Sequence, residues 1–465
     1  MKYKNVSVLG LGKTGVAVAN LLSDHGVRVF VSDNSPEEKL KKYIPLLKNG
    51  IEYETGGHTT RVLSAGLIVK SPGVPNDISV IADARAKGID VLDELEISYG
   101  LIKPKVLVAI TGTNGKTTTT ALVGEILKNA GMRTVVGGNI GNPLSGLVDK
   151  IDGSTAVVLE VSSYQLEGIR GFRPDVCAIL NITPDHLERH KSMSGYIEAK
   201  KRIYMNQTGD DVCILNMDDE SIRDLFLKKE INPVSKTLFF MKEMQEAAIP
   251  GGGVFYGASW RDGRFEVTLP PLSGNREAVV NARMSVNARL KIPGRHNIEN
   301  ALAAVCISAV CGVPAEVIRK TLNDFPGVEH RIQFVREIKG VKYINDSKST
   351  NVDSTRTALD SFDTPVILIM GGRDKGFPYT PLFDRVRKNV KALLLIGESA
   401  EKIKKELGGS TQIVDCGDLA AAVRKASEIA VAPDVVLLSP GCSSFDQFEN
   451  YEDRGGQFIR QVNSL

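Results

Sequence analysis

The chain has 465 residues, about three times the usual length of one domain, so more than one hydrophobic core is expected. Hydrophobic residues make up 42% and charged residues 24%, which excludes a disordered chain, a collagen-like rod and a small disulfide-stapled scaffold. Its 58 Lys and Arg against 55 Asp and Glu give a net charge of +3 that is spread along the chain. A nucleic-acid-binding protein usually concentrates positive charge in one region, so small-molecule partners are the better expectation.

The six cysteines form no CxxC pair and no spacing typical of a zinc site. Their scatter is compatible with disulfides but favours reduced core thiols in a cytosolic protein. The N-terminus leads straight into a strand and a glycine loop, without a signal peptide, and no apolar run approaches the ~18 residues of a membrane span. We therefore expect a soluble, cytoplasmic monomer that binds neither membranes nor nucleic acid.

The first predicted elements form a strand–loop–helix–strand unit. An apolar strand at Val6–Leu9 leads into the glycine-rich segment 10–15 (GLGKTG), and apolar residues at helical spacing follow until Gly26. A second strand at Val27–Val31 ends just before Asp33. This β-α-β order is typical of a Rossmann-like domain.

Gly10, Gly12 and Gly15 match the GxGxxG pattern of nucleotide-binding loops, and Asp33 lies where a ribose-binding acid is expected. Such glycines let the backbone approach a diphosphate, whose charge the N-terminus of the following helix favours. A tight turn without a ligand is the simpler alternative, because the pattern alone is weak. Strand, helix and acid together favour a nucleotide diphosphate, and the loop leaves NAD, FAD and a UDP-sugar all open.

A later strand, Val106–Ile110, leads into a more specific phosphate loop, TGTNGKT at 111–117. In such a loop Lys116 reaches the β- and γ-phosphates of a nucleotide, and the Thr117 hydroxyl binds magnesium. The loop departs from the standard P-loop because Ile110 stands where that loop needs a glycine. The residues expected to contact ATP here are Gly112, Thr113, Asn114, Gly115, Lys116, Thr117 and Thr118.

Two later segments supply candidates for the same sheet edge. Glu160 ends an apolar strand, where its carboxylate can bind magnesium, although an acid after a strand is most often an ordinary loop residue. The segment 181–186 follows another strand, Cys177–Leu180, and forms a turn into a helix. His186 and His190 lie four residues apart, but without a third ligand at fitting spacing an ordinary surface pair is favoured over zinc.

Lys200 lies on a predicted helix at Gly195–Gln207, on the stripe that also carries Tyr196 and Ile203. An unpaired charge on an apolar stripe is costly, which indicates a function. The alternative is a lysine whose stem packs while its amino group reaches solvent. The periodicity leaves both interpretations equally open.

The remaining elements complete a three-domain organisation. Short strands and hairpins are expected at 231–290, with glycines at 251–253 and a turn centred on Gly257, and no function is assigned there. Pro326-Gly327 marks a boundary, beyond which apolar runs separated by helical stretches predict a mainly parallel sheet. These runs are Tyr343–Ile344, Val366–Met370, Ala392–Ile396 and Val435–Leu438. We predict an α/β protein with a Rossmann-like domain at 1–97, a central P-loop-containing, ATPase-like domain at 98–327 and a Rossmann-like domain at 328–465.

Over nearly its whole length the chain resembles the Mur ligase superfamily, the ATP-dependent amide-forming enzymes of peptidoglycan precursor synthesis. The resemblance rests on TGTNGKTT (111–118), GGNIGNPL (137–144), LEVSSYQL (159–166), NITPDHLERH (181–190), EAKKRIY (198–204), PGRHNIENALAA (293–304), EHR (329–331) and INDSKSTN (344–351). Three further features are similar to the branch that adds D-glutamate to UDP-N-acetylmuramoyl-L-alanine. They are GLGKTG with SPGVP (71–75), GGRDKG (371–376) and LSPGCSSFDQFENYEDRG (438–455).

The resemblance implies roles that spacing alone does not give. The first glycine loop binds the UDP-substrate with Gly10, Gly12, Thr14, Gly15, Asp33, Asn34, Ser71 and Asn139. Lys200 matches a lysine that carries a carbamate and, with His186, holds a second magnesium ion, while Thr117 and Glu160 hold the first. Further ATP contacts are Asn297, Arg331, Asp346 and Lys348. The positions around D-glutamate are Thr350, Lys375, Ser444, Phe445 and Tyr451.

The implied reaction is ATP-dependent ligation through an acyl phosphate, with Lys116, Glu160, His186 and Lys200 as the catalytic residues. A sister ligase or a folylpolyglutamate synthase is the nearest alternative within the superfamily, and the C-terminal DQFENYEDRG argues against both. An NAD-dependent oxidoreductase would leave the second phosphate loop unexplained. A binding module without chemistry would bind ATP and release no phosphate.

Overall fold

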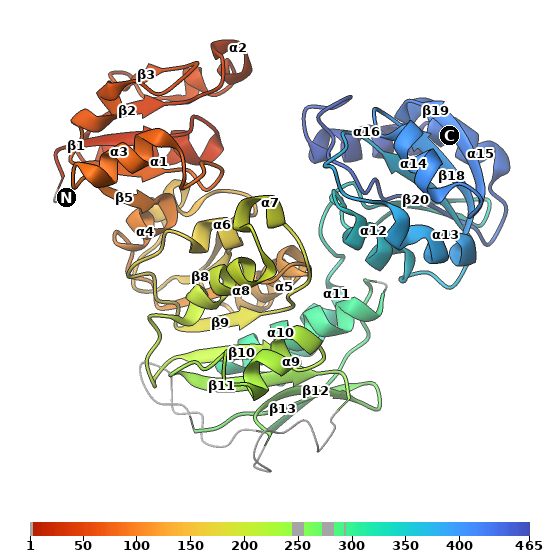
Figure 1. Ribbon diagram of the computed structural model, residues 1–465. Coiled ribbons are helices and arrows are strands. Elements are labelled where there is room, and N and C mark those ends of the chain that lie inside the picture. Colours follow the sequence, from red (N-terminus) through yellow and green to blue (C-terminus); the bar gives the residue numbers. More distant parts are fainter. Residues whose placement is uncertain (1–2, 244–254, 272–282, 293) are drawn as a thin grey trace. The chain divides into compact units, whose positions relative to one another are not determined.

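The computed structural model describes residues 3–243, 255–271, 283–292 and 294–465. The chain divides into two units. Unit 1 comprises Met1–Ala288 and Glu299–Thr321, and unit 2 comprises Arg289–Ile298 and Leu322–Leu465. Each unit is built from mainly parallel sheets covered by helices, which confirms the predicted α/β class (Figure 1). No helix in the described part of the chain is long and apolar enough to cross a bilayer.

The first sheet of unit 1 has the strand order 3-2-1-4-5 and is parallel throughout, as expected for a Rossmann-like domain. Its strands are β1 (Asn5–Leu9), β2 (Arg28–Ser32), β3 (Glu52–Glu54), β4 (Leu67–Lys70) and β5 (Asp90–Asp93). The helices that follow them are α1 (Lys13–Asp24), α2 (Glu37–Leu40), α3 (Ser79–Ala86) and α4 (Glu94–Tyr99).

Apolar residues on both faces explain why this sheet is covered by helices on both sides. Val8 and Val31 pack on one face in a cluster with Val18 and other residues of α1. Ile68 packs on the opposite face with Ile81 and other residues of α3. Parallel strands that are buried on both faces are typically rich in apolar residues, as in β4 (LIVK) and in β1 (NVSVL), where Ser7 is buried as well.

The second sheet of unit 1 has the order 14-13-12-11-10-9-6-8-7. The strands are β6 (Val106–Thr111), β7 (Thr134–Gly138), β8 (Ala156–Glu160), β9 (Val176–Ile179), β10 (Val212–Asn216), β11 (Lys236–Met241), β12 (Gly257–Arg261), β13 (Arg264–Thr268) and β14 (Arg283–Asn287). The phosphate loop follows β6, an inner strand between β9 and β8. The helices between these strands are α5 (Lys116–Asn129), α6 (Ser163–Leu166), α7 (Leu187–His190), α8 (Met193–Lys201) and α9 (Glu220–Leu227). The next helices along the chain are α10 (Arg295–Val310) and α11 (Ala315–Asp324).

The hairpins expected at 231–290 are present, but one predicted turn is wrong. β12 to β14 pair antiparallel at one edge of the sheet. Gly257 begins β12, and the turn lies instead at Asp262-Gly263, where both residues have positive φ. A Cβ at position 257 would lie 1.7 Å from the Phe239 carbonyl oxygen, so glycine there permits close strand approach. The glycines at 251–253 lie outside the described residues.

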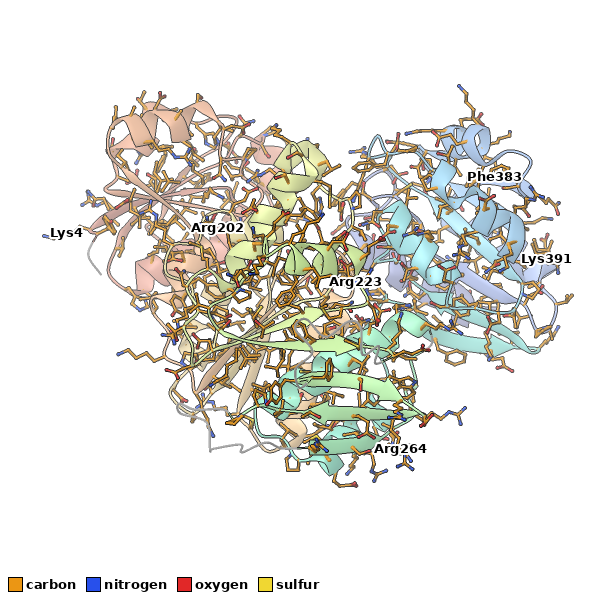
Figure 2. All side chains as sticks on the ribbon, turned by 60° about the horizontal axis from the view of Figure 1, so that its bottom comes forward. Lys4, Arg202, Arg223, Arg264, Phe383 and Lys391 are labelled. Carbon is orange, nitrogen blue, oxygen red and sulfur yellow. The ribbon has the colours of Figure 1, made fainter. Side chains whose placement is uncertain are left out.

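Unit 2 contains a sheet of order 15-16-20-17-18-19, parallel except for β15. Its strands are β15 (Gln333–Ile338), β16 (Val341–Asn345), β17 (Val366–Gly371), β18 (Val390–Ile396), β19 (Gln412–Gly417) and β20 (Val435–Leu438). Its later helices are α12 (Val352–Leu359), α13 (Phe383–Asn389), α14 (Ala400–Leu407), α15 (Leu419–Ile429) and α16 (Tyr451–Asn463). Lys391 of β18, labelled in Figure 2, pairs with the buried Asp434 at 2.8 Å and so ties β18 to the start of β20.

Two smaller expectations have clear outcomes. All six cysteines are free thiols, and Cys177, Cys213, Cys306 and Cys442 are buried, so the reduced interpretation is confirmed. The helix predicted at Gly195–Gln207 begins earlier and ends earlier, at Met193–Lys201, and a short 3-10 turn at Arg202–Tyr204 follows.

Candidate active site

The carboxyl end of the second sheet of unit 1 gathers the predicted phosphate, metal and lysine residues. β9, β6, β8 and β7 are neighbours and run parallel, so the segments that follow them meet at one edge. Those segments carry His186, the phosphate loop at 112–115, Glu160 and Asn139, in that order across the sheet. Ligand sites of open α/β sheets lie at this edge, where helix N-termini and loops converge.

The phosphate loop has a conformation that its glycines make possible. Gly115 has φ of 81° and stands immediately before α5, and a Cβ there would lie 2.2 Å from Oδ1 of Asn300. A Cβ at Gly112 would lie 2.9 Å from Cβ of Leu180. Both positions therefore need glycine for backbone geometry and for close packing.

The loop is fastened to the segment after β9. The Thr113 N–H donates to the Asn181 carbonyl at 3.0 Å, and the Asn114 N–H donates to Asn181 Oδ1 at 2.7 Å. The Thr113 hydroxyl lies 3.1 Å from the Thr183 carbonyl and 3.0 Å from the Tyr196 hydroxyl. These hydrogen bonds join the phosphate loop to the segment 181–183, which leads to His186.

Lys116 and Lys200 converge on one carbonyl of this loop. The ammonium of Lys116 donates to the Gly112 carbonyl at 2.8 Å and to the Thr113 carbonyl at 2.6 Å. Nζ of Lys200 donates to the same Gly112 carbonyl at 2.8 Å. The ammonium of Lys116 gives this small loop a positive charge, which suits a polyphosphate.

The burial of Lys200 decides between its two sequence interpretations. The residue is 1% exposed, and its amino group lies 4.5 Å from the centre of the Tyr196 ring. An amino group that reaches solvent is thereby excluded. Burial, together with the charge of Lys116, holds the pKa of Lys200 well below its usual value, while Asp185 acts in the opposite direction.

Glu160 ends β8 with one oxygen engaged and one without a partner. Its Oε1 accepts a hydrogen bond from Nδ2 of Asn139 at 2.7 Å, and its carbonyl accepts from the Asn139 N–H at 2.8 Å. Its Oε2 is buried and accepts no hydrogen bond from any residue in the described ranges. A buried carboxylate oxygen without a partner is costly unless a ligand or metal completes it.

His186 and His190 lie at the two ends of the short helix α7, His186 immediately before it and His190 as its last residue. His186 has φ of 54°, which is rare for a non-glycine residue, and its ring lies 4.9 Å from the Tyr164 ring. His190 is not the surface residue expected from the sequence. Its side chain is 3% exposed and lies 2.9 Å from the Ser163 hydroxyl and 3.3 Å from Glu167 Oε1.

An ion pair joins α7 to the loop after β4. Arg189 pairs with Glu167 at 2.8 Å, and both side chains are largely buried, at 12% and 14% exposed. The same guanidinium donates to the Val74 carbonyl at 3.0 Å, and Nδ2 of Asn76 donates to Glu167 at 2.8 Å. Arg189 also lies over the Tyr164 ring at 5.1 Å. The helix that carries His186 is therefore held against residues 74–76.

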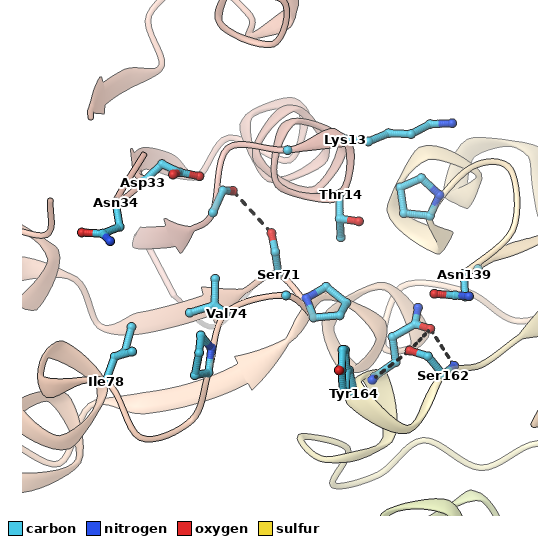
Figure 3. A pocket seen from close by; sticks show the side chains of 18 of the residues that line it. Lys13, Thr14, Asp33, Asn34, Ser71, Val74, Ile78, Asn139, Ser162 and Tyr164 are labelled. Atoms are coloured by element: carbon cyan, nitrogen blue, oxygen red, sulfur yellow. Dashed lines mark hydrogen bonds between the residues drawn. The ribbon is translucent and has the colours of Figure 1, made fainter. Parts of the chain in front are cut away.

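A cavity of about 920 Å³ lies between the first and second sheets of unit 1 (Figure 3). The predicted UDP-substrate residues Gly10, Gly12, Thr14, Asp33, Asn34, Ser71 and Asn139 all line it. Lys13, His58, Val74, Ser162, Tyr164 and Gln165 also line it and were not predicted. Lys13 lies within the first glycine loop but at a position that the glycine pattern leaves open, and the other five residues come from separate segments of the chain.

Gly15 and Asp33 support the first glycine loop from behind. A Cβ at Gly15 would lie 1.7 Å from the Gly10 carbonyl oxygen, so this glycine lets α1 pack against the loop, and it does not line the cavity. The Asp33 carboxylate accepts hydrogen bonds from the N–H groups of Leu11 at 2.6 Å and Ser35 at 2.7 Å. Asp33 therefore fixes the loop as well as facing the cavity.

In unit 2, parallel neighbours again bring separate segments together. β16, β20 and β17 are adjacent, so the segments after them, 346–350, 439–445 and 372–376, lie at one sheet edge. The Gly441 N–H donates to the Ser349 carbonyl at 2.9 Å, and Arg373 pairs with Ser443 as an isolated bridge. This edge holds Asp346, Lys348, Thr350, Lys375, Ser444 and Phe445.

Asp346 is the most buried acid of this edge. Burial raises its pKa to about 6, although the charge of Arg331 and hydrogen bonds from Ser349 and Ser439 act to lower it. Nε of Arg331 is buried without a hydrogen-bond partner among the described residues. Asn297, on α10, is also buried, at 4% exposed.

The predicted D-glutamate residues differ in exposure. Nζ of Lys375 lies 3.4 Å from the Thr350 hydroxyl, with Lys375 exposed. Ser444 is buried, whereas Phe445 is 62% exposed. Tyr451 begins α16 with its ring 5.3 Å from Nζ of Lys348.

Arg454 was not singled out from the sequence, yet it connects two of these segments. Its guanidinium is fully buried and donates to the Ser347 hydroxyl, to the Ser347 carbonyl and to the carbonyls of Cys442 and Ser443. Burial lowers its pKa to about 10. The sequence pattern around Arg454 gave no signal that this charged residue is buried.

Three family comparisons cover most of the chain. Residues 4–93 match the N-terminal domain of MurD-like Mur ligases, residues 110–308 the Mur ligase middle domain, and residues 330–442 the glutamate ligase domain of Mur ligases.

Full-length relatives and solved structures are similar to this chain. The UDP-N-acetylmuramoylalanine--D-glutamate ligase of Koribacter versatilis is 44% identical, covering 100% of this chain and 98% of the relative. The ligase of the same name from Clostridioides difficile is 40% identical, with 100% and 99% covered. The fold is similar to that of Thermotoga maritima UDP-N-acetylmuramate-alanine ligase MurC (TM-score 0.58, 20% identity, 99% of each chain). It is also similar to Thermotoga maritima MurF ligase in complex with ADP (TM-score 0.57, 16% identity, 98% of each chain).

Proposed function

The chain belongs to the Mur ligase family, and from this membership and the geometry of its sites we propose how it works. It is an ATP-dependent ligase that adds D-glutamate to UDP-N-acetylmuramoyl-L-alanine in peptidoglycan precursor synthesis. The observation that carries the assignment of the reacting centre is the convergence of Lys116 and Lys200 on the Gly112 carbonyl, at the sheet edge that also holds Glu160.

The reaction proceeds in two steps. A carboxylate oxygen of the L-alanyl group attacks the γ-phosphorus of ATP, the bond to the β-γ bridging oxygen breaks, and ADP leaves. The amine of D-glutamate then attacks the carbonyl carbon of the acyl phosphate, loses a proton, and expels phosphate as the amide forms. An anionic carboxylate approaching a polyphosphate is repelled, so the first step needs concentrated positive charge.

Lys116 supplies part of that charge, and the surrounding residues fit magnesium. Lys116 leaves the loop carbonyls at 112 and 113 to bind the β- and γ-phosphates when ATP enters. Thr117 and Glu160 would hold one ion, which fits the buried, unpartnered Oε2 of Glu160 and the preference of magnesium for oxygen ligands. Bound magnesium would neutralise charge on the transferring phosphoryl group.

Lys200 is suited to reaction with carbon dioxide. Because its pKa is lowered, its amine is available in the neutral form. The nitrogen lone pair forms a bond to the carbon of carbon dioxide, one proton is released, and a carbamate anion results. We assign this carbamate and His186 to a second magnesium ion.

The cavity of unit 1 is assigned to the UDP-substrate. Gly10, Gly12, Thr14, Asp33, Asn34, Ser71 and Asn139 are its proposed contacts, and Gly15 supports the loop. Asn139 also bonds Glu160 at 2.7 Å, so the cavity ends beside the proposed reacting centre. The residues that bind the substrate thereby lead its alanyl carboxylate toward the phosphate loop.

Unit 2 is assigned to the amino acid and to part of the ATP site. Asn297, Arg331, Asp346 and Lys348 are proposed ATP contacts, and Thr350, Lys375, Ser444, Phe445 and Tyr451 surround D-glutamate. Lys375 acts as a point charge on a glutamate carboxylate, which suits its exposed ammonium beside Thr350. The three family matches fall within 1–97, 98–327 and 328–465, which supports those ranges as the substrate, ATP and amino-acid domains.

Phosphate release tests this function directly. The purified chain is given Mg-ATP and UDP-N-acetylmuramoyl-L-alanine with D-glutamate, L-alanine, a diamino acid or no amino acid. We expect release that depends on both the UDP-substrate and D-glutamate. Release that depends on another amino acid would contradict the assigned specificity, and release that ignores the UDP-substrate would contradict the ligase reaction.

A further inference from the structure

His58 lies on the wall of the UDP-substrate cavity, and the proposed reaction gives it no role. It follows β3 and precedes a short 3-10 turn at Thr60–Ser64, and it is half-buried. Asp33 and Asn34 line the same part of the cavity from the end of β2. The chemistry of this corner depends on which ring nitrogen of His58 carries a proton.

A chain of hydrogen bonds behind the ring fixes that proton. Glu54 Oε1 lies 2.7 Å from the Ser32 hydroxyl oxygen and accepts from the Thr59 N–H at 3.0 Å. Partial burial acts to raise the pKa of Glu54, but hydrogen bonds from Thr59 and Ser32 outweigh it, so the net pKa is lowered and the group is an anion at neutral pH. A carboxylate only accepts, so the single proton of Ser32 points to Glu54.

The same hydroxyl oxygen lies 2.7 Å from Nδ1 of His58. Because the Ser32 proton is already used, Nδ1 must donate and Ser32 must accept. The neutral ring therefore carries its proton on Nδ1 and a lone pair on Nε2. Burial lowers the pKa of His58 despite the opposing charges of Asp33 and Glu54, which keeps the ring neutral near pH 7.

The lone pair of Nε2 is available to a ligand. Nε2 has no hydrogen bond to any residue in the described ranges and is not fully buried, and His58 lines the cavity. The Asp33 carboxylate beside it is also an acceptor. This corner therefore favours a ligand that presents N–H or O–H donors.

The direction of the substrate follows from the opposite end of the cavity. Asn139 and Ser162 line that end, away from Asp33 and Asn34 (Figure 3). The side chain of Gln165 bonds Ser162, and Asn139 bonds the proposed metal ligand Glu160. The alanyl carboxylate must lie there to meet ATP, which leaves the uridine at the corner of Asp33 and His58. Uridine offers two kinds of donor, the N3–H of uracil and the ribose hydroxyls.

We propose that Nε2 of His58 accepts a hydrogen bond from the uridine of the substrate, and that Ser32 and Glu54 hold the ring in the tautomer that can accept it. The proposal rests on the proposed UDP-substrate site. His58 is a specificity-determining residue in this account, with Ser32 and Glu54 as positioning residues.

Calorimetric titration with UDP tests the proposal without requiring turnover. His58→Phe keeps a planar ring but removes the acceptor, and we expect its Kd for UDP to rise about tenfold while the KM for ATP is unchanged. His58→Gln can turn its amide oxygen to the ligand and should recover part of the affinity. His25→Phe, an exposed histidine at the end of α1 and outside the cavity, is the matched control and should bind UDP normally.

Two analogues identify the donor. N3-methyl-UDP removes the uracil donor, and 2′-deoxy-UDP removes a ribose donor. The analogue that lacks the relevant donor should bind the wild-type chain weakly and His58→Phe no worse than UDP does. We also expect the wild-type Kd to rise as pH falls and His58 gains a second proton, with no such rise in His58→Phe.

Two results would overturn the assignment of His58 and leave the proposed function standing. One is an unchanged Kd for UDP in His58→Phe. The other is that each analogue weakens binding, relative to UDP, by the same factor in the wild-type chain and in His58→Phe. A wild-type chain that does not bind UDP overturns both the assignment of His58 and the proposed function. If His58→Phe has a lower melting temperature but discriminates between UDP and each analogue as the wild-type chain does, the ring has only a structural role and the proposal is wrong.

Discussion

At the scale of single residues, Lys200 carries the most specific expectation. Its buried amine with a lowered pKa should take up carbon dioxide, and Arg at this position keeps a cation but cannot form the carbamate. We expect Lys200→Arg to lose at least about 100-fold in phosphate release, because an anion of the reacting centre is replaced by a cation (~3 kcal/mol).

Carbon NMR after equilibration with labelled bicarbonate checks the cause of that loss. A carbamate resonance should appear in the wild-type chain and be absent from Lys200→Arg. Lys201→Arg is the matched control, because Lys201 pairs with Glu198 and should change neither activity nor the resonance. A wild-type chain that is fully active in carbon-dioxide-free buffer, without this resonance, would contradict the assignment.

Lys375 and Ser444 give a second residue-scale prediction. Each is assigned to D-glutamate, so Lys375→Ala and Ser444→Ala should raise the KM for D-glutamate about tenfold or more and leave the KM for ATP nearly unchanged. Steady-state kinetics with each substrate varied in turn measures both constants. Lys425→Ala, which removes an exposed pair with Glu428, serves as control. Equal increases in both KM values would show that the two residues do not act on D-glutamate.

At the scale of elements, α7 links the substrate cavity to His186. Arg189 of this helix pairs with Glu167 and holds the Val74 carbonyl, while Val74 lines the cavity. Arg189→Met should therefore raise the KM for the UDP-substrate about tenfold and also lower kcat, because the helix that carries His186 loses its anchor. Kinetics of Arg189→Met, Glu167→Gln and the double variant measure the effect.

The loss of kcat/KM in the double variant, expressed as a free energy, should be smaller than the sum of the losses in the two single variants, because the two side chains act as one unit. Arg319→Met is the control. It breaks an exposed pair with Glu316 on α11, whose side chains are 44% and 71% exposed, and should change neither constant. Strict additivity of the two changes would refute a joint role for Arg189 and Glu167.

Local sequence patterns predicted the two glycine-containing loops, because each depends on a strand, a glycine turn and a helix that are adjacent in sequence. The strand end at Glu160 was predicted from the apolar run that precedes it. The burial of His190 and the ion pair of Arg189 could not be predicted in the same way. Both depend on Glu167, which lies on a different connection of the second sheet, and the Arg189 guanidinium also bonds the Val74 carbonyl, which comes from the first sheet. Lys200 illustrates the limit, because periodicity located it on the apolar stripe and only its burial in the folded chain, at 1% exposed, excluded a solvent-facing amine.

At the scale of the whole molecule, stability should respond to the protonation of Asp346. Its pKa is raised from 3.8 to about 6 in the folded chain, so the folded state holds a proton that the unfolded state loses near pH 4. The stabilisation that results is complete below about pH 4 and disappears as pH rises through about 6, a change of about 3 kcal/mol.

Comparison with Asp346→Asn isolates this contribution, because asparagine does not titrate. Unfolding in urea at constant ionic strength should show the wild-type chain losing stability relative to the variant between about pH 4 and 7. If the difference in free energy of unfolding between the two proteins stays constant over this pH range, the raised pKa of Asp346 is contradicted.

The central claim is that the alanyl carboxylate of the UDP-substrate becomes an acyl phosphate before the amide forms. Transfer of a heavy-oxygen label tests it most directly. The substrate is labelled in its alanyl carboxylate, turned over with ATP and D-glutamate, and the released phosphate is analysed by phosphorus NMR. The account predicts one labelled oxygen in each phosphate released, because the attacking oxygen leaves with phosphorus. Phosphate without label, or label recovered in AMP, would contradict it.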